Sequence, residues 1–181
     1  MLDDSNQPPQ NALLTKLKSL GEARKMVEKL FDMIGHSKFF IDFTHDDVEL
    51  LSDFMNMYQA DAGEMIIQEG DVDDYMLFIV EGRVNIVKSD SQGEVRPMSV
   101  VGPGSTLGEM SMIDGEPRFA TCIAIDSTTF AVLSREKMVR IIMEEPALGS
   151  KILIKLVTLL SQRLRSTSSD LLHHLERSEA V

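Results

Sequence analysis

The sequence predicts a mainly β fold of the jelly-roll type, a double-stranded β-helix roll, with N-terminal helices and a long C-terminal helix flanking it. Three observations predict this fold. Between Gly63 and Leu133, short β-prone runs alternate with turn residues and no helical period is sustained. Before and after this block, apolar residues recur with the period of an amphipathic helix. The chain has 181 residues, enough for one core with a helical extension but few for two ordinary domains.

The N-terminal part is predicted to be helical. Residues 1–10 are polar, contain a proline pair and are expected to form a disordered tail. From Asn11 to about Gly35 the apolar spacing predicts an amphipathic helix, which buries its stripe against this domain or against another chain. Thr44 precedes acidic residues and is a candidate N-cap for a second helix. Residues 11–61 are therefore expected to form a helical segment.

Residues 62–134 are predicted to form the β-roll. Turn signals such as Glu69-Gly70-Asp71 and Gly102-Pro103-Gly104 separate its strands. The predicted strands are Glu64 to Gln68, Tyr75 to Val80, Arg83 to Lys88, Arg96 to Val101, Ala120 to Ile125 and Thr128 to Leu133. Short strands at this spacing are typical of a sandwich or jelly roll.

The C-terminal part, residues 135–177, is predicted to return to helix. A short helix follows Ser134, and a long one runs from about Ala147 to Leu175, with Pro146 well placed to begin it. The long helix carries a stripe of leucines: Leu153, Leu156, Leu160, Leu164, Leu171 and Leu175. This stripe is wide enough to cover the roll, to pair with a second copy, or to do both.

Composition and charge disfavour several classes of protein. The chain has 18 Lys and Arg against 29 Asp and Glu, and this net charge of −11 disfavours binding to nucleic acid. No apolar run approaches a membrane span, and the N-terminus lacks the pattern of a signal peptide, so a cytoplasmic protein that does not enter a membrane is expected. The single cysteine, Cys122, is expected to be a buried structural thiol. The four histidines lie outside the predicted strands, so neither a metal nor a cofactor is expected.

A segment with distinctive chemistry lies between Gly102 and Ala124, where a turn of predicted helix, Glu109 to Ile113, interrupts the strands. A helix start reached through glycines exposes backbone amides that favour an anion. Arg118 follows nine residues after Glu109 and can fold back to place a permanent positive charge beside the same anion. The Glu109 carboxylate would repel an inorganic anion but could accept a hydrogen bond from a ligand hydroxyl. An anion beside a hydroxyl indicates a sugar phosphate.

The run from Gly108 to Thr121, GEMSMIDGEPRFAT, resembles the phosphate-binding cassette of cyclic-nucleotide-binding domains, the family of the catabolite activator protein and of protein kinase A regulatory subunits. Upstream, Gly63-Glu64, Glu69-Gly70-Asp71 and Glu81-Gly82 look like the strand-and-turn framework of that family in the same order. The resemblance spans about Phe39 to Arg165 and implies a β-roll that binds a cyclic nucleotide as its ligand, with cAMP preferred to cGMP.

The resemblance also implies roles for individual residues. Glu109 would accept a hydrogen bond from the ribose 2′-hydroxyl, and Arg118 would pair with the cyclic phosphate. Backbone amides near Ser111, Phe119 and Ala120 would complete the phosphate cradle. The residues expected to surround the ligand in this segment are Gly108, Glu109, Met110, Ser111, Arg118, Phe119 and Ala120. The alternative for Glu109 and Arg118 is an ordinary surface ion pair.

Phe119 departs from the family pattern, which usually has a small residue at this position. Threonine there is associated with better cGMP binding, and phenylalanine lacks that hydroxyl, which argues against a preference for cGMP. Two placements stay open for the aromatic ring. Either it contacts the base of the ligand, or it turns into the core and only its backbone faces the ligand.

The long C-terminal helix is expected to act both as a lid over the base and as the seam of a homodimer. In the catabolite activator protein, a threonine-serine pair on the corresponding helix meets the adenine. Here Thr167 lies about one helical turn beyond that position, which Arg163 occupies, so either residue could reach the base. Arg163 is slightly favoured because a guanidinium can also stack on the ring. The alternative is that both residues are simply solvated.

These observations predict a regulatory cyclic-nucleotide-binding module that acts on its own dimer or on an unidentified protein partner. No catalytic motif occurs, so the chain is not expected to be an enzyme. Few residues follow the long helix, so neither a DNA-binding nor a catalytic output domain is expected. The alternative is a structural or protein-interaction β-roll that has lost useful nucleotide affinity. The sequence leaves open whether the N-terminal helix packs in cis or across a dimer.

Overall fold

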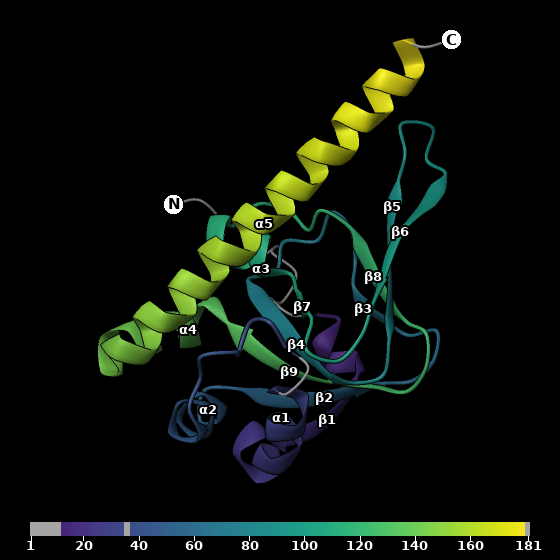
Figure 1. Cartoon of the computed structure of the whole chain (residues 1–181). Coiled ribbons are helices and arrows are strands. Elements are labelled where there is room, and N and C mark those ends of the chain that lie inside the picture. The colour runs from purple at the N-terminus through teal and green to yellow at the C-terminus, as the bar shows by residue number, and fades with distance from the viewer. Residues whose placement is uncertain (1–11, 35–36, 180–181) are drawn as a thin grey trace, which may run out of the picture.

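The computed structural model describes residues 12–34 and 37–179, and in them two antiparallel sheets close into a β-roll (Figure 1). The strands of the described residues are β1 (Lys18–Glu22), β2 (Asn56–Ala60), β3 (Met65–Ile67), β4 (Tyr75–Glu81), β5 (Val84–Ser89), β6 (Val95–Val101), β7 (Thr106–Leu107), β8 (Thr121–Ala124) and β9 (Thr128–Ser134). One sheet has the order β1-β2-β9-β4-β7, and the other has the order β3-β8-β5-β6. The predicted jelly-roll class is confirmed, and the tail predicted for residues 1–10 lies outside the described residues.

Helices precede and follow the roll along the chain, and one short helix lies between two of its strands. They are the short 3-10 helices η1 (Leu14–Lys16) and η2 (Ala23–Met26), and the α-helices α1 (Val27–Ile34), α2 (His45–Ser52), α3 (Glu109–Asp114), α4 (Arg135–Glu144) and α5 (Pro146–Glu179). Thr44 caps α2 as predicted, because its hydroxyl accepts from the amide of Asp47 at 3.2 Å and its own amide donates to the Asp47 carboxylate at 2.7 Å. Ser134 caps α4, and Pro146 begins α5 as predicted.

Strand β4, which lies between β9 and β7, faces two hydrophobic cores, because its side chains alternate between the two faces of the sheet. Tyr75, Leu77 and Ile79 lie in the core inside the roll. Met76 and Phe78 lie in a second core, which the sheet shares with the flanking helices. A strand buried on both faces reads as a continuous apolar run, which explains the sequence YMLFIV at this place.

The helix predicted from Asn11 to about Gly35 is wrong over its first half, and residues 11–61 are not a purely helical segment. The chain instead forms η1, strand β1 and η2 before α1 begins at Val27. Gly21 has a φ of 89°, which lies outside helical geometry, and β1 pairs with β2 at the edge of the sheet. Tertiary pairing therefore overrides the apolar spacing. Helix α1 packs in cis, against α2 and β4 of the same chain.

Of the leucine stripe predicted on α5, Leu156 is buried in the core that the helices share with the sheet, whereas Leu153 is 40% exposed. The buried face of the first part of the helix is completed by Leu148 and Ile152. Farther along, Leu164 and Leu171 are 69% and 59% exposed. Figure 1 shows this second half projecting past the roll. Among the residues that the structure describes, no helix is both long and apolar enough to cross a membrane.

Candidate functional site

A cavity of about 110 Å³ lies where β7 runs into α3. Its lining comes from three strands of the second sheet (β3, β5 and β8), from β7, from the segment around α3 and from α5. The lining residues are Ile67, Ile86, Leu107, Gly108, Glu109, Met110, Ser111, Arg118, Phe119, Ala120, Cys122 and Arg163. This cavity, the cassette cavity, brings together every predicted ligand-binding residue except Thr167.

The cassette cavity depends on the backbone of Gly108, which turns the chain from β7 into α3. Gly108 has a φ of 76°, in the left-handed region that side chains disfavour. A Cβ atom at this position would lie 2.5 Å from Nη1 of Arg118 and 2.9 Å from the carbonyl oxygen of Tyr75. Glycine is therefore required here both for the turn and for the close approach of the guanidinium.

Arg118 is a buried cation, with only 3% of its surface exposed. Its Nη1 donates to the carbonyl of Gly108 at 3.0 Å, and its guanidinium carbon lies 4.3 Å from the centre of the Tyr75 ring. Within the described part of the chain, Nε and Nη2 of Arg118 are buried without a hydrogen-bond partner. A buried donor left unpaired is costly, so these two nitrogens are suited to receive an anion.

Glu109 begins α3 and is 2% exposed. Its Oε1 forms an ion pair with Nη1 of Arg163, and Nη2 of Arg163 donates to the carbonyl of Thr106 at 2.9 Å. Its Oε2 is buried and has no hydrogen-bond partner among the described residues. Burial raises the pKa of the Glu109 carboxyl above its usual value, and the positive charges of Arg163 and Arg118 oppose that rise.

The surface ion pair considered for Glu109 and Arg118 is wrong, because both side chains are buried and Glu109 pairs with Arg163. Arg163 does reach the cassette from α5, but its guanidinium is directed to the carboxylate of Glu109. Thr167 is exposed and does not line the cavity. A contact of either residue with the base of a ligand stays a prediction.

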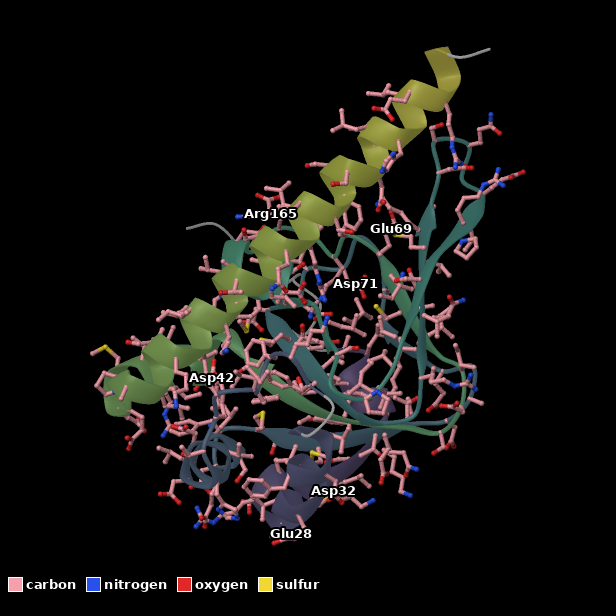
Figure 2. All side chains as sticks on the ribbon, viewed as in Figure 1. Glu28, Asp32, Asp42, Glu69, Asp71 and Arg165 are labelled. Atoms are coloured by element: carbon pink, nitrogen blue, oxygen red, sulfur yellow. The ribbon has the colours of Figure 1, made fainter. Side chains whose placement is uncertain are left out.

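Phe119 holds its ring outside the core, with 52% of its surface exposed. Lys88 of β5 lies over the ring, with Nζ 4.2 Å from its centre, and donates to the carbonyl of Phe119 at 2.7 Å. Nζ of Lys88 also donates to Oε1 of Glu69 at 2.7 Å (Glu69 in Figure 2). The placement of the ring in the core is therefore wrong, and its contact with the base stays a prediction.

Cys122 lies in the wall of the cassette cavity and is buried, as predicted. Burial raises the pKa of its thiol to about 12, so the thiolate is scarcely populated near neutral pH. The role of this cysteine is to pack against its neighbours.

Three residues that contact the site or α3 were not predicted from the sequence. Thr106 supplies a carbonyl to Arg163, Lys88 holds the ring of Phe119, and Arg135 contacts α3 from outside the cavity. A backbone carbonyl carries no sequence signal, because every residue has one. Lys88 and Arg135 gain their partners from distant parts of the chain, so spacing along the sequence could not have identified them.

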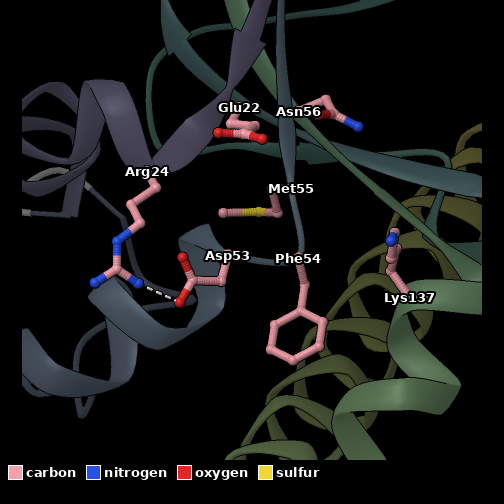
Figure 3. Close-up of a pocket in the computed structure, with 7 residues that line it drawn as sticks. All are labelled: Glu22, Arg24, Asp53, Phe54, Met55, Asn56 and Lys137. Atoms are coloured by element: carbon pink, nitrogen blue, oxygen red, sulfur yellow. Dashed lines mark hydrogen bonds and ion pairs between the residues drawn. The ribbon is translucent and has the colours of Figure 1, made fainter.

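A larger pocket of about 270 Å³, the outer pocket, lies on another part of the molecule, between β1, the start of β2 and α4 (Figure 3). It is lined by Glu22, Arg24, Asp53, Phe54, Met55, Asn56 and Lys137. Arg24 forms an ion pair with Asp53 across this pocket and a second one with Glu49 at 3.2 Å. About half of the Arg24 side chain is exposed, at 53%.

Comparisons with known proteins agree with this geometry. The profile of the family described as cyclic nucleotide-binding domain matches residues 58–145. The crystal structure of a cyclic nucleotide-binding domain from Methylobacillus flagellatus is 38% identical, covers 89% of this chain and 90% of its own, and has a TM-score of 0.79.

The cyclic AMP receptor protein of Thermus thermophilus is 27% identical over 75% of this chain and 61% of the receptor. The cAMP-dependent protein kinase type II regulatory subunit of Drosophila melanogaster is 33% identical over 60% of this chain and 28% of the subunit. This chain thus spans less than two thirds of the length of these curated relatives. The matching profile and the similar fold at 38% identity lead to one conclusion: the chain belongs to the cyclic nucleotide-binding domain family.

Proposed function

We propose that this chain is a regulatory module whose ligand is cAMP. One observation carries the proposal: the cassette cavity holds buried donors on Arg118 and a buried acceptor on Glu109 that have no protein partner in the described residues. Each unsatisfied buried polar group costs about 1–3 kcal/mol. A cyclic phosphate would accept from Arg118, and a ribose hydroxyl would donate to Oε2 of Glu109. One ligand of this chemistry satisfies both.

The proposed pose keeps the contact between Glu109 and Arg163. Arg163 occupies Oε1, so the ribose hydroxyl takes Oε2, and the ion pair holds the carboxylate in place for it. The base would then extend toward Phe119 and α5, which form the remaining walls of the cavity. The names of the Thermus and Drosophila relatives support cAMP as the nucleotide.

A homodimer through α5 is the second part of the proposal. The exposed leucines of its projecting half, including Leu164 and Leu171, form an apolar face that a second copy could cover. Light scattering is expected to find a dimer in the parent and a monomer in Leu164→Asp. A monomeric parent at high concentration, with and without cAMP, would remove this part of the proposal.

One observation favours the alternative of a β-roll that has lost nucleotide affinity. The cassette cavity measures about 110 Å³. Ligand pockets commonly measure about 300–1,000 Å³. On the main proposal, binding must therefore widen the cavity, and the exposed ring of Phe119 is the wall that can move.

Isothermal titration of the full chain with cAMP, cGMP and a cyclic dinucleotide tests the proposal. The expected result is saturable binding of cAMP that is tighter than binding of cGMP. A ligand at about 100 times its Kd should also add about 2.7 kcal/mol to stability, which a thermal shift would detect. Failure of all three to bind would favour the alternative of a protein-interaction domain.

The role of Glu109 has its own test within the same titrations. Glu109→Ala is expected to weaken cAMP binding, and most of that loss should vanish when the ligand is 2′-deoxy-cAMP. An equal loss with both ligands would show that Glu109 does not bind the ribose hydroxyl.

A further inference from the structure

Arg135 stands at the junction of β9 and α4, and its side chain reaches the C-terminal end of α3. Its Nε donates to the carbonyl of Met112 at 2.7 Å, and its Nη2 donates to the carbonyl of Ser111 at 2.8 Å. The carbonyls in the last turn of a helix have few or no partners within the helix, and a guanidinium fork can donate to two neighbouring ones at once. The backbone amide of Arg135 also donates to the carbonyl of Asp74 at 2.7 Å. Arg135, the first residue of α4, therefore contacts both α3 and the segment that precedes β4.

The fit between Arg135 and α3 is close, as Gly115 shows. Gly115 ends α3 with a φ of 80°, and its amide donates to the carbonyl of Ser111 at 3.0 Å. A Cβ atom on Gly115 would lie 3.2 Å from Nη2 and 3.3 Å from Nη1 of Arg135. The guanidinium is thus packed directly on the end of the helix, and a methyl group at Gly115 would have to displace it by a few tenths of an ångström.

Helix α4 continues into α5 as one packed unit. The amide of Gly149 donates to the carbonyl of Glu145 at 2.9 Å, and a Cβ atom on Gly149 would lie only 2.9 Å from the Cα atom of Ile142. The backbone of the first turn of α5 therefore packs directly against the backbone of α4. Farther along the same helix, Arg163 holds Glu109 at the start of α3. Arginines of the C-terminal helices thus hold α3 at both of its ends.

We infer that Arg135 is a positioning residue that transmits a movement of α3 to α4 and α5. The inference rests on the proposed function, because the ligand phosphate beside Arg118 is what would move α3. A rival route runs through the side chain of Met112, which is buried in the same core as Met138 of α4 and Ile152 of α5. Apolar contact alone would make the hydrogen bonds of Arg135 dispensable for the transmission.

The test uses the full chain with spin labels on Ala62→Cys in the roll and Arg165→Cys on α5. Arg165 projects from the face of α5 that points away from the roll (Figure 2), and the buried native cysteine is protected from labelling. The distance between the labels is measured with and without cAMP in the parent, in Arg135→Gln and in Arg135→Lys. Arg140→Gln is the matched control, because Arg140 lies on α4 but pairs with Glu144 of its own helix.

Titration calorimetry on the same variants separates binding from transmission. The expected result is that cAMP changes the distance in the parent and in Arg140→Gln. Arg135→Gln should still bind cAMP, with about a fivefold to tenfold loss of affinity, but should show less than about half of the distance change. Arg135→Lys should lie in between, because one ammonium cannot donate to both carbonyls in the geometry of the fork. A change in Arg135→Gln equal to that of the parent would overturn the inference, and so would a parent that binds cAMP without any change.

A parent that does not bind cAMP would refute the proposed function. In that case, hydrogen exchange measured without ligand still tests the role of Arg135. Arg135→Gln is then expected to lose amide protection in α3 and also in the first turns of α5. Loss confined to α3 would show a local cap without transmission and would overturn the inference.

Discussion

The cassette cavity and the outer pocket differ in how their polar groups are satisfied. The outer pocket is the larger, at about 270 Å³ against about 110 Å³, yet its arginine already pairs with two carboxylates at the surface (Figure 3). The cassette cavity buries Arg118 and Glu109 and leaves polar atoms of both without a partner in the described residues. Volume favours the outer pocket over the cassette cavity. Unsatisfied buried polarity favours the cassette cavity as the proposed ligand site, because such polarity is costly unless a ligand relieves it.

The largest expected effect comes from replacing the arginine of each pocket with alanine. Arg118→Ala is expected to weaken cAMP binding by about thirtyfold or more, since losing one member of a buried charge pair costs roughly 2–5 kcal/mol. Arg24→Ala is the matched control and should bind cAMP within about a factor of two of the parent, because its ion pairs are exposed. Titration calorimetry measures both. Equal effects of the two substitutions would remove the distinction between the pockets.

A smaller effect should follow from adding one methyl group at a glycine. Gly108→Ala and Gly93→Ala both place a side chain at a positive φ, which should cost about 1–2 kcal/mol of unfolding free energy in Gly93→Ala and more in Gly108→Ala, where the methyl group also meets close neighbours. Only Gly108 lies against Arg118, whereas a Cβ atom on Gly93 would meet nothing within 4 Å. Gly108→Ala should therefore also weaken cAMP binding, and Gly93→Ala should leave it unchanged. Urea unfolding and titration of both variants check this, and an unchanged affinity in Gly108→Ala would contradict the close packing described for Arg118.

The smallest expected effect is a change in the unfolding free energy with pH, which depends on the burial of Glu109. Its folded-state pKa is raised, so its contribution to stability is present below the unfolded value of about 4.3 and is lost as the pH rises through the folded-state pKa. The difference in unfolding free energy between the parent and Glu109→Gln should therefore shift toward the variant as the pH rises. Urea unfolding between about pH 4 and about pH 7 measures it. A shift toward the parent over this range would mean that the positive charges outweigh the burial.

Much of the fold was predictable because local signals and packing agree. The apolar run of β4, the Thr44 cap and the proline at the start of α5 each specify their element without help from distant residues. Strand β1 was missed because Leu20 continues the helical spacing of Leu13 and Leu17, and only pairing with β2 makes the segment extended. Strand β7 has two residues, too few to give a pattern.

The site was predictable where one contiguous segment carries it. Glu109 and Arg118 belong to a single motif, and the structure brings both to one cavity as expected. The ion pair of Arg163 with Glu109 joins residues that are 54 positions apart, and its geometry depends on how α5 crosses the roll. The hold of Arg135 on α3 has the same origin. Contacts of this kind follow from tertiary packing and leave no periodic signal.

Tyr75, the first residue of β4, contacts several parts of the candidate site. The ring of Tyr75 supports Arg118, its carbonyl lies beneath Gly108, and its partner across the sheet is Ser134, which caps α4. An insertion or deletion within β4 would move all of these by one residue and would also exchange the side chains that face the two cores. The turn between β5 and β6 carries no such constraint, so changes of length in related chains should accumulate there and be rare in β4.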